Sequence, residues 1–289
     1  MLKPTWISWL LFVYGDFTKY EILDDGIFVP ANSDFDIKHI LECGQVFRFK
    51  SRDFGYTLYS KEHKADIYCQ KDGTKIVCKN KNYIINYLDL DTNYAIIKSQ
   101  LGKYNLSDAI AYGAGIRILK QDPLEMIISF IISANNNIPR IKNTIEKLCE
   151  GYGTRYDDYY GFPTLDQLSK IDLQFFRQIG CGYRAGYLVD TIQQLKNVDL
   201  GELYQMDTES ARKELMKLKG VGRKVADCIL LFGFSKTDVF PTDTWITQAY
   251  QDEFGDNNMS AVKISEFYSK RFGNLSGYAQ QYMFYAKRK

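Results

Sequence analysis

The sequence predicts an α+β protein in which a small antiparallel β-sheet domain precedes a larger all-α domain. Strand-like alternation is confined to residues 28–80, whereas helical periodicity continues from residue 91 almost to the end. The length agrees, because 289 residues are enough for about two domains. We place the boundary near residue 115, with the β-rich domain at 1–115 and the helical domain at 116–289.

The first part contains four short segments in which apolar and polar residues alternate, as they do in half-buried strands. Turn-forming residues separate the segments, which is typical of an antiparallel meander. A helix before the strands and one after them are expected to cover one face of the sheet. The expected strands are QVFRFK at 45–50, GYTLYS at 55–60, ADIYCQ at 65–70 and TKIVCK at 74–79, and the expected helices are DFDIKHIL at 34–41 and NKNYIINYLDL at 80–90.

From residue 91 onward, apolar residues recur at the spacing of amphipathic helices. Asp122 followed by Pro123 predicts a helix start with the aspartate as its N-cap. Gly151, Gly180 and Gly233 are expected to end their helices.

Composition excludes several classes of protein. The formal net charge is only +2, so charge alone does not indicate binding to nucleic acid. Six scattered cysteines without CxxC spacing favour reduced thiols in a cytoplasmic protein. The two histidines, His39 and His63, leave the later chain without a Ser/His/Asp triad or a histidine-rich zinc site. No apolar run of about 18 residues occurs, so no membrane span is expected.

The N-terminal run MLKPTWISWLLFVYG superficially resembles the core of a secretory signal peptide. It contains Pro4, lacks an A-x-A cleavage site and leads into Asp16. We therefore expect the protein not to be exported.

The stretch from Leu218 to Asp243 carries the most specific pattern in the chain. Gly220-Val221-Gly222 lies between two helical patterns, which indicates a tight hairpin. A hairpin that ends at a helix N-terminus presents backbone N–H groups that suit a phosphate. The spacing matches neither a P-loop nor a dinucleotide-binding fingerprint.

Three reactive side chains follow this hairpin. Lys224 lies in the first turn of the second helix, where an amine can serve as a nucleophile. Cys228 lies one turn further along the same face, and Asp243 is expected to cap another helix. Taken singly, each residue has an ordinary explanation: a surface lysine, a core cysteine and a helix cap.

Together, the hairpin, the lysine and the trailing aspartate resemble the helix-hairpin-helix motif of the DNA glycosylase superfamily. The resemblance implies that Gly220, Val221 and Gly222 grip the DNA backbone. It also implies that Lys224 attacks the sugar C1′ and that Asp243 assists. The four closely spaced cysteines that hold an iron–sulfur cluster in some glycosylases are absent from the sequence.

Three further segments resemble those of 8-oxoguanine DNA glycosylases, and the first is CGQVFR at 43–48. On its own, Gly44 reads as a loop glycine before a strand. The resemblance implies that its carbonyl accepts a hydrogen bond from N7–H of the damaged base. Undamaged guanine carries a hydrogen-bond acceptor at N7, so its lone pair faces the lone pair of the same carbonyl and binding of the normal base is disfavoured.

The second segment is SANNNIPR at 133–140, which is joined later by GYRA at 182–185. Without the resemblance, these residues read as a polar helix end and an ordinary helix start. Arginine and amide groups can read a base edge with paired hydrogen bonds, and an aromatic wedge replaces lost stacking. The resemblance implies contacts to the unpaired cytosine from Asn135, Arg140 and Arg184, and a wedge formed by Tyr183.

The third segment is GYAQQYMF at 277–284, in which Gln280 and Phe284 share a helix face. The ordinary explanation is a terminal amphipathic helix with the phenylalanine in the core. The resemblance implies that Gln280 binds the Watson–Crick edge of the flipped base, and that Phe284 stacks on it opposite Cys228. A flipped purine needs two flat contacts and an edge reader.

These landmarks follow the family's order from about Asp34 to Phe284. Trp245 departs from the pattern, because many members carry there a histidine that touches a DNA phosphate. That contact is expected to be weaker or absent.

The sequence thus predicts a bifunctional 8-oxoguanine DNA glycosylase/AP lyase that acts as a monomer on double-stranded DNA, with 8-oxoguanine opposite cytosine. The amine chemistry implies no metal and no organic cofactor, although hairpin carbonyls in the family can hold an ion. No membrane partner is expected, and the location is cytoplasmic, or nucleoid-associated in a prokaryote.

Three alternatives remain at this point. An endonuclease-III-like enzyme for oxidised pyrimidines usually brings cluster cysteines and gives no reason for Gly44, Gln280 and Phe284. An alkylpurine glycosylase typically lacks the lysine. A non-catalytic helix-hairpin-helix DNA-binding protein tolerates any residue at positions 224 and 243.

Overall fold

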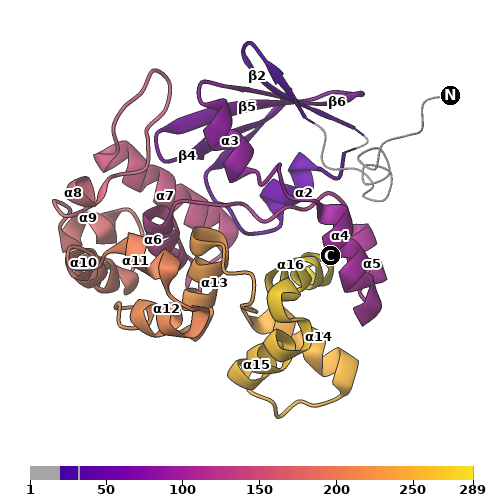
Figure 1. The fold of residues 1–289 in the computed structure, drawn as a ribbon. Coiled ribbons are helices and arrows are strands. Elements are labelled where there is room, and N and C mark those ends of the chain that lie inside the picture. Colours follow the sequence, from indigo (N-terminus) through magenta and orange to yellow (C-terminus); the bar gives the residue numbers. More distant parts are fainter. Residues whose placement is uncertain (1–19, 32, 289) are drawn as a thin grey trace.

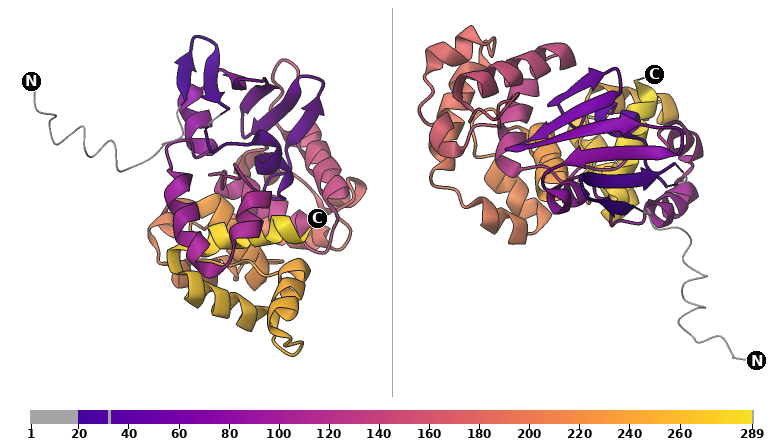
Figure 2. Two further views of the ribbon diagram at one scale, coloured as in Figure 1. Left: turned by 90° about the vertical axis from the view of Figure 1, so that its right-hand side faces the viewer. Right: turned by 90° about the horizontal axis from the view of Figure 1, so that it is seen from above.

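The computed structural model describes residues 20–31 and 33–288. The N-terminal run considered above as a signal peptide lies outside the described residues. A β-sheet forms one layer of the molecule, and two groups of helices lie beneath it (Figure 1). Seen from above, the sheet lies over the C-terminal helices (Figure 2).

The sheet has six antiparallel strands in the order β1-β2-β6-β5-β4-β3. Strands β3 to β6 form the predicted meander. The hairpin of β1 and β2, which the sequence analysis does not predict, extends the sheet by pairing β2 with β6. The strands are β1 Glu21–Leu23, β2 Gly26–Pro30, β3 Phe49–Arg52, β4 Gly55–Ser60, β5 His63–Cys69 and β6 Gly73–Cys78.

The first strand of the meander begins later than predicted, because residues 45–48 are irregular. The buried Gln45 amide donates a hydrogen bond to the Arg117 carbonyl at 2.8 Å and accepts one from Leu119 N–H at 2.9 Å. These two hydrogen bonds hold residues 45–48 against the segment that contains Arg117 and Leu119. The alternation of apolar and polar residues in QVFRFK therefore has two causes. The first residues of this stretch are buried against that segment, and only its last residues form a strand.

Two helices cover one face of the sheet, as predicted. They are α2 Ile37–Glu42 and α3 Lys81–Tyr87, and their apolar residues share one core cluster with strand residues such as Ile67. Their first turns are capped by the side chains of Asp36 and Asn80.

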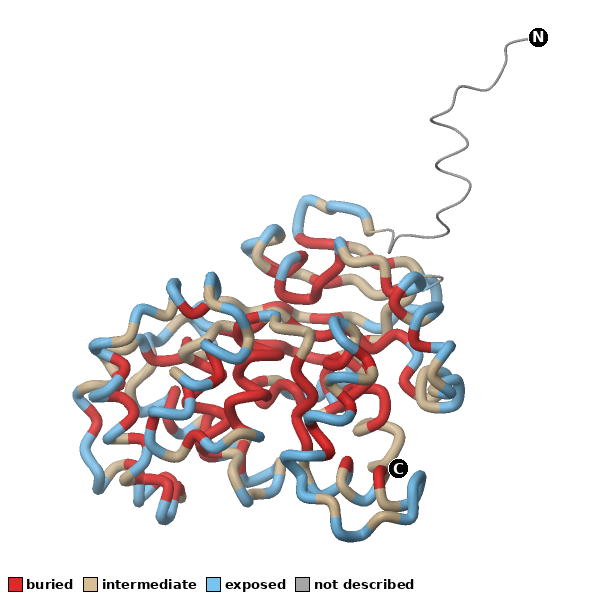
Figure 3. The backbone as a smooth tube through the Cα atoms, turned by 60° about the horizontal axis from the view of Figure 1, so that its bottom comes forward, coloured by how far each residue is buried: buried red, intermediate tan, exposed pale blue. Residues whose placement is uncertain are grey.

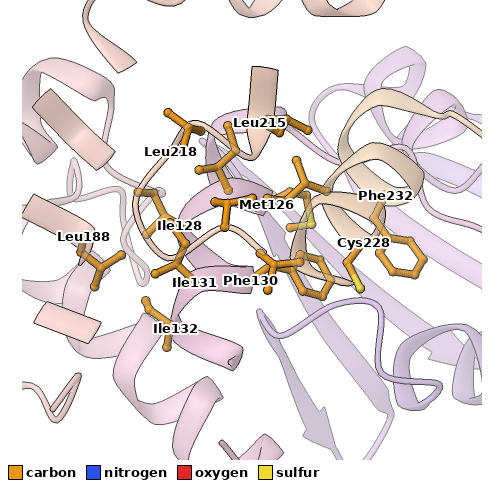
Figure 4. Packing of buried hydrophobic residues seen from close by; sticks show 14 of the residues in the cluster. Met126, Ile128, Phe130, Ile131, Ile132, Leu188, Leu215, Leu218, Cys228 and Phe232 are labelled. Carbon is orange, nitrogen blue, oxygen red and sulfur yellow. The ribbon is translucent and has the colours of Figure 1, made fainter. Parts of the chain in front are cut away.

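The first helical group runs from α6 to α13 and contains the largest core cluster. Asp122 caps α6 and Pro123 opens it, as predicted. Phe130 on α6 and Phe232 on α13 are stacked, with ring centroids 5.7 Å apart (Figure 4). The helices are α6 Pro123–Ser133, α7 Ile138–Tyr152, α8 Leu165–Leu168, α9 Leu173–Gln178, α10 Arg184–Leu195, α11 Leu200–Gln205, α12 Thr208–Leu215 and α13 Arg223–Phe234.

The second helical group combines helices from both ends of the chain. Its core cluster joins residues such as Tyr94 to Tyr268 and Tyr282, so it draws on both sides of position 115. The domain boundary near residue 115 stays a prediction. The elements are α4 Tyr94–Leu101, η1 Gly102–Tyr104, α5 Ser107–Tyr112, α14 Thr244–Phe254, α15 Ala261–Phe272, η2 Gly273–Leu275 and α16 Ser276–Lys287.

Two of the three glycines expected to end helices lie inside them instead. Gly151 is within α7 and Gly233 within α13, whereas Gly180 does follow α9, with a φ of +97°. A Cβ at Gly151 would lie 2.5 Å from the Phe175 ring, and one at Gly233 would lie 3.3 Å from Met126. These two glycines therefore serve close packing rather than helix termination.

Buried backbone is concentrated in the centre of the molecule, and most of the exposed backbone lies at its outer turns (Figure 3). All six cysteines belong to the described part of the chain and none is paired, in agreement with the prediction of free thiols. No helix in residues 20–31 or 33–288 is long and apolar enough to cross a membrane.

Candidate active site and DNA-contact loops

Residues 218–222, which we call the hairpin, connect α12 to α13. Gly220 has a φ of +80°, and a Cβ there would lie 2.9 Å from the Tyr187 side chain. Only glycine therefore fits this position without strain. The Lys219 carbonyl accepts a 2.7 Å hydrogen bond from the Thr191 hydroxyl. Both contacts hold the hairpin against α10.

The N-terminus of α13 presents backbone donors that no side chain caps. Gly222 is its N-cap, and a Cβ at this position would meet nothing within 4 Å. Gly222 and Lys224 are exposed, whereas Val221 is buried and anchors the hairpin. The free N–H groups and the helix dipole together favour an anion such as a DNA phosphate.

The two predicted catalytic residues, Lys224 and Asp243, line the same small cavity. The Lys224 Nζ lies 5.7 Å from the centroid of the Phe130 ring. Asp243 is the N-cap of α14, as predicted, and accepts a 3.0 Å hydrogen bond from Ile246 N–H. The cavity is lined by Gly44, Phe130, Lys224, Cys228, Phe232, Pro241, Asp243, Gln280, Gln281 and Phe284.

The structure thus brings together all four residues expected to bind the damaged base, from three distant segments. Cys228 projects from α13, Gln280 and Phe284 from α16, and Gly44 from the loop after α2. Gly44 has a φ of +88°, and a Cβ there would lie 3.1 Å from the Phe284 ring. Because Phe284 packs against Gly44, the cavity measures only about 40 Å³, roughly the space of one water molecule.

Two polar groups of the cavity wall indicate how it can act. The Gln280 Oε1 atom is buried and has no hydrogen-bond partner among the described residues, so it is available to a ligand. Burial raises the pKa of the Cys228 thiol, and the nearby Lys224 ammonium lowers it in part. The thiol therefore stays protonated and serves as a polarisable wall of the cavity.

Sequence reasoning missed other residues around the cavity. The Gln281 Nε2 group donates a 2.9 Å hydrogen bond to the Cys43 carbonyl and so holds the turn that contains Gly44. Arg288 lies over the Phe284 ring, with its guanidinium carbon 5.1 Å from the ring centroid. The signal for Arg288 is its spacing, since it follows Phe284 by one helical turn.

The residues expected to face the unpaired cytosine gather at a second place, where the loop after α6 meets the start of α10. Arg184 donates 2.6 Å hydrogen bonds to the carbonyls of Asn135 and of the residue before it. A third bond reaches the Cys181 carbonyl, so two of its five N–H groups remain. Arg140 donates to the Gly180 carbonyl at 3.2 Å.

Tyr183 stands out from this second site. Its side chain is 58% exposed, although it is aromatic, and the Arg184 guanidinium carbon lies 4.5 Å from its ring centroid. A supported, solvent-facing ring is suited to enter a base stack.

Comparisons with known proteins agree with this geometry. The model of the 8-oxoguanine DNA glycosylase N-terminal domain matches residues 27–127, and that of the HhH-GPD superfamily base excision DNA repair protein matches residues 128–280. The probable N-glycosylase/DNA lyase of Methanothermobacter thermautotrophicus is 32% identical over 221 residues, which cover 68% of this chain and 70% of that protein.

Two further relatives extend the similarity to most of the chain. The N-glycosylase/DNA lyase of Saccharomyces cerevisiae is 28% identical, covering 87% of this chain and 83% of its own. A crystal structure of Clostridium acetobutylicum 8-oxoguanine glycosylase/lyase, bound to dsDNA with cytosine opposite 8-oxoG, is 36% identical. It has a TM-score of 0.90 and covers 94% of this chain and 98% of its own. The chain therefore belongs to the HhH-GPD superfamily of base excision DNA repair proteins and carries the N-terminal domain of 8-oxoguanine DNA glycosylases.

Proposed function

We propose that the protein is a bifunctional 8-oxoguanine DNA glycosylase and AP lyase, which excises 8-oxoguanine from duplex DNA and then cuts the strand. One observation carries this proposal: Lys224 and Asp243 line the same cavity as Gly44, Gln280 and Phe284. An amine nucleophile beside a pocket that reads a base is the combination that a base-excising lyase requires. We call this cavity the base pocket.

The free amine of Lys224 attacks C1′ of the flipped nucleotide. The C1′–N9 bond breaks, and the base departs with the bonding electrons and takes up a proton. Opening of the sugar ring yields a Schiff base between Lys224 and C1′. Loss of a C2′ proton then expels the 3′ phosphate, which cuts the strand by β-elimination. The Asp243 carboxylate stabilises the positive charge on the sugar and orients the amine.

The walls of the base pocket recognise the lesion. The Gly44 carbonyl accepts a hydrogen bond from N7–H of 8-oxoguanine. Guanine has an acceptor at N7 instead, and the carbonyl repels it. The unpartnered Gln280 amide oxygen binds the Watson–Crick edge, and Phe284 and Cys228 cover the two faces of the base. Because the cavity is only about 40 Å³ in the free protein, Phe284 moves away from Gly44 when the base enters.

The remaining contacts hold the duplex. Asn135, Arg140 and Arg184 read the cytosine opposite the lesion, and Tyr183 fills the gap in the base stack. Gly220, Val221 and Gly222 hold the DNA backbone: Val221 anchors the hairpin, and the uncapped N–H groups at the α13 start bind a phosphate.

Trp245 is 43% exposed in the first turn of α14 and supplies no charge to the phosphate nearest Asp243. The protein acts as a monomer. Its free cysteines favour the cytoplasm, or the nucleoid of a prokaryote.

A strand-cleavage assay tests this function. Duplexes that carry 8-oxoguanine opposite each of the four bases are compared with an oxidised-pyrimidine duplex and an undamaged one. We expect cleavage of the 8-oxoguanine strand, fastest opposite cytosine, together with an adduct trapped by borohydride. Cleavage of only the oxidised-pyrimidine strand indicates the endonuclease-III-like alternative. Binding to every duplex without any cleavage indicates a non-catalytic DNA-binding protein.

A further inference from the structure

Arg288 extends the face of α16 that lines the base pocket. Gln280, Phe284 and Arg288 follow one another at intervals of four residues, so their side chains lie in a row. The Arg288 guanidinium carbon is 5.1 Å from the centroid of the Phe284 ring. Its Nη1 atom is 3.0 Å from the position that a Cβ on Gly44 would occupy. Arg288 therefore lies directly behind two neighbouring residues of the pocket wall, Gly44 and Phe284.

The same Nη1 atom is buried and donates no hydrogen bond to any described residue. Arg48 and Arg223 also have buried N–H groups without hydrogen bonds, but each of these guanidinium groups has a carboxylate beside it: the Arg48 Nε lies 3.5 Å from a Glu146 oxygen and the Arg223 Nε lies 4.0 Å from an Asp227 oxygen. No carboxylate within residues 20–31 and 33–288 forms an ion pair with Arg288. A buried cationic donor without a partner is costly, and an acceptor on a ligand removes that cost.

We propose that Arg288 is a specificity-determining residue whose Nη1–H donates a hydrogen bond to the C8 oxygen of 8-oxoguanine. The inference rests on the proposed function. 8-Oxoguanine differs from guanine at two adjacent atoms, a donor at N7 and a carbonyl oxygen at C8. With the Gly44 carbonyl on N7–H, a cationic donor against Gly44 lies beside the C8 oxygen.

Guanine offers only C–H at C8, so it leaves Nη1 buried and unpaired. The base pocket thereby reads both atoms that oxidation changes. Because the same guanidinium rests on Phe284, the hydrogen bond also holds the stacked ring over the base.

Binding measurements with Arg288→Met test the proposal, because methionine keeps an unbranched apolar stem and removes the donor. The full chain carries Lys224→Gln as well, so that DNA is bound without being cut. Fluorescence anisotropy gives Kd for three duplexes: one with 8-oxoguanine, one with 8-aminoguanine, which has a donor at C8, and one with a tetrahydrofuran abasic site. We expect Arg288→Met to weaken binding to 8-oxoguanine by about 10- to 100-fold, and to leave the other two values within about twofold.

A kinetic measurement without Lys224→Gln gives an independent readout. Arg288→Met is expected to slow excision of 8-oxoguanine by a similar factor and to leave AP-lyase cleavage of an abasic duplex unchanged, since no base occupies the pocket. Arg271→Met is the matched control, because its guanidinium carbon lies 5.6 Å from the centroid of the Phe272 ring and Phe272, unlike Phe284, does not line the pocket. Thermal unfolding confirms that each variant folds, and Arg288→Leu, which also lacks a donor, replaces Arg288→Met if it does not.

Equal losses on all three duplexes would identify a phosphate contact or general support of the fold, and they overturn the proposal. Unchanged discrimination between 8-oxoguanine and 8-aminoguanine overturns it as well. A wild-type protein that cleaves no 8-oxoguanine duplex refutes the proposed function itself, so the two failures are distinguishable.

Discussion

The hairpin and the base pocket are built in opposite ways. The hairpin is five consecutive residues, and it ends at the exposed Gly222, where no side chain caps the N-terminus of α13. The base pocket is assembled from a loop near residue 44, from α13 and from α16, and it is small, at about 40 Å³. The free hydrogen-bonding groups of Gln280, in its wall, and of Arg288, beside that wall, are buried.

Because of this difference, the hairpin is suited to binding the DNA backbone regardless of sequence, and the base pocket is suited to distinguishing the damaged base from a normal one. An exposed helix end attracts any phosphate, because the dipole and the N–H groups carry no information about sequence. Buried groups without partners favour one ligand and penalise a ligand that leaves them unpaired. A substitution in the hairpin should therefore weaken binding to every duplex, and a substitution in the base pocket should weaken only recognition of the damaged base.

Lys224→Gln gives the largest expected effect, because Lys224 sits between the two regions and belongs to the chemistry. Excision and strand cleavage should fall by at least about 1,000-fold, and the borohydride-trapped adduct should disappear. Binding to an 8-oxoguanine duplex should persist, since the hairpin and the residues that read the base, Gly44, Gln280 and Phe284, are unaltered. Single-turnover cleavage and anisotropy measure the two effects. A trapped adduct with the glutamine variant rules out Lys224 as the nucleophile.

Gly44→Ala should damage discrimination alone. The residue has a φ of +88°, and the new methyl group meets the Phe284 ring at 3.1 Å and Arg288 at 3.0 Å. Backbone strain of about 1–2 kcal/mol and the intruding methyl group should slow 8-oxoguanine excision about tenfold or more. Cleavage of an abasic duplex should be unaffected. If the rates on the 8-oxoguanine and abasic duplexes fall equally, the substitution disturbs the catalytic lysine as well as base recognition.

Gly220→Ala is the counterpart in the hairpin. Its φ of +80° and the 2.9 Å approach of Tyr187 make a methyl group unfavourable there. The variant should bind 8-oxoguanine, abasic and undamaged duplexes all about tenfold more weakly, because only the phosphate grip is distorted. Anisotropy at one fixed salt concentration measures this. Weaker binding to the 8-oxoguanine duplex alone would contradict the assignment of backbone binding to the hairpin and of lesion recognition to the base pocket.

Glu125→Gln should produce the smallest effect, on stability rather than activity. Glu125 lies on α6 and accepts a 3.0 Å hydrogen bond from Lys61 N–H, so it joins the turn between β4 and β5 to the first helical group. Burial raises its pKa to about 7. The stability that the protonated acid provides is fully present below about pH 4 and is lost as the pH rises to about 7.

Glutamine keeps the acceptor and cannot ionise. The free energy of unfolding of Glu125→Gln should exceed that of the wild type by on the order of 1–3 kcal/mol at pH 8 and should match it near pH 4. Urea denaturation across this range measures the difference, with the exposed Glu150→Gln on α7 as control. A constant difference at every pH assigns the effect to packing instead of charge.

Local patterns in the sequence determined much of this protein. The glycine pair predicted the hairpin, and Asp122-Pro123 predicted the start of α6. The residue type and position of Asp243 predicted the cap of α14. Such features depend on a few neighbouring residues and on backbone geometry, so a sequence can specify them without knowledge of the fold. The spacing of Gln280 and Phe284 likewise placed them on one face of α16.

Tertiary packing decided the rest, because it depends on which surfaces meet. The pairing of β2 with β6, the burial of Gln45 against the Arg117 segment and the close approach of Phe175 to Gly151 all join residues far apart in the chain. No local spacing predicts such contacts. The seating of Arg288 between Phe284 and Gly44 is of the same kind, since it exists only where α16 meets the loop after α2. The small pocket and the unpaired donor beside it are therefore properties of the assembled fold.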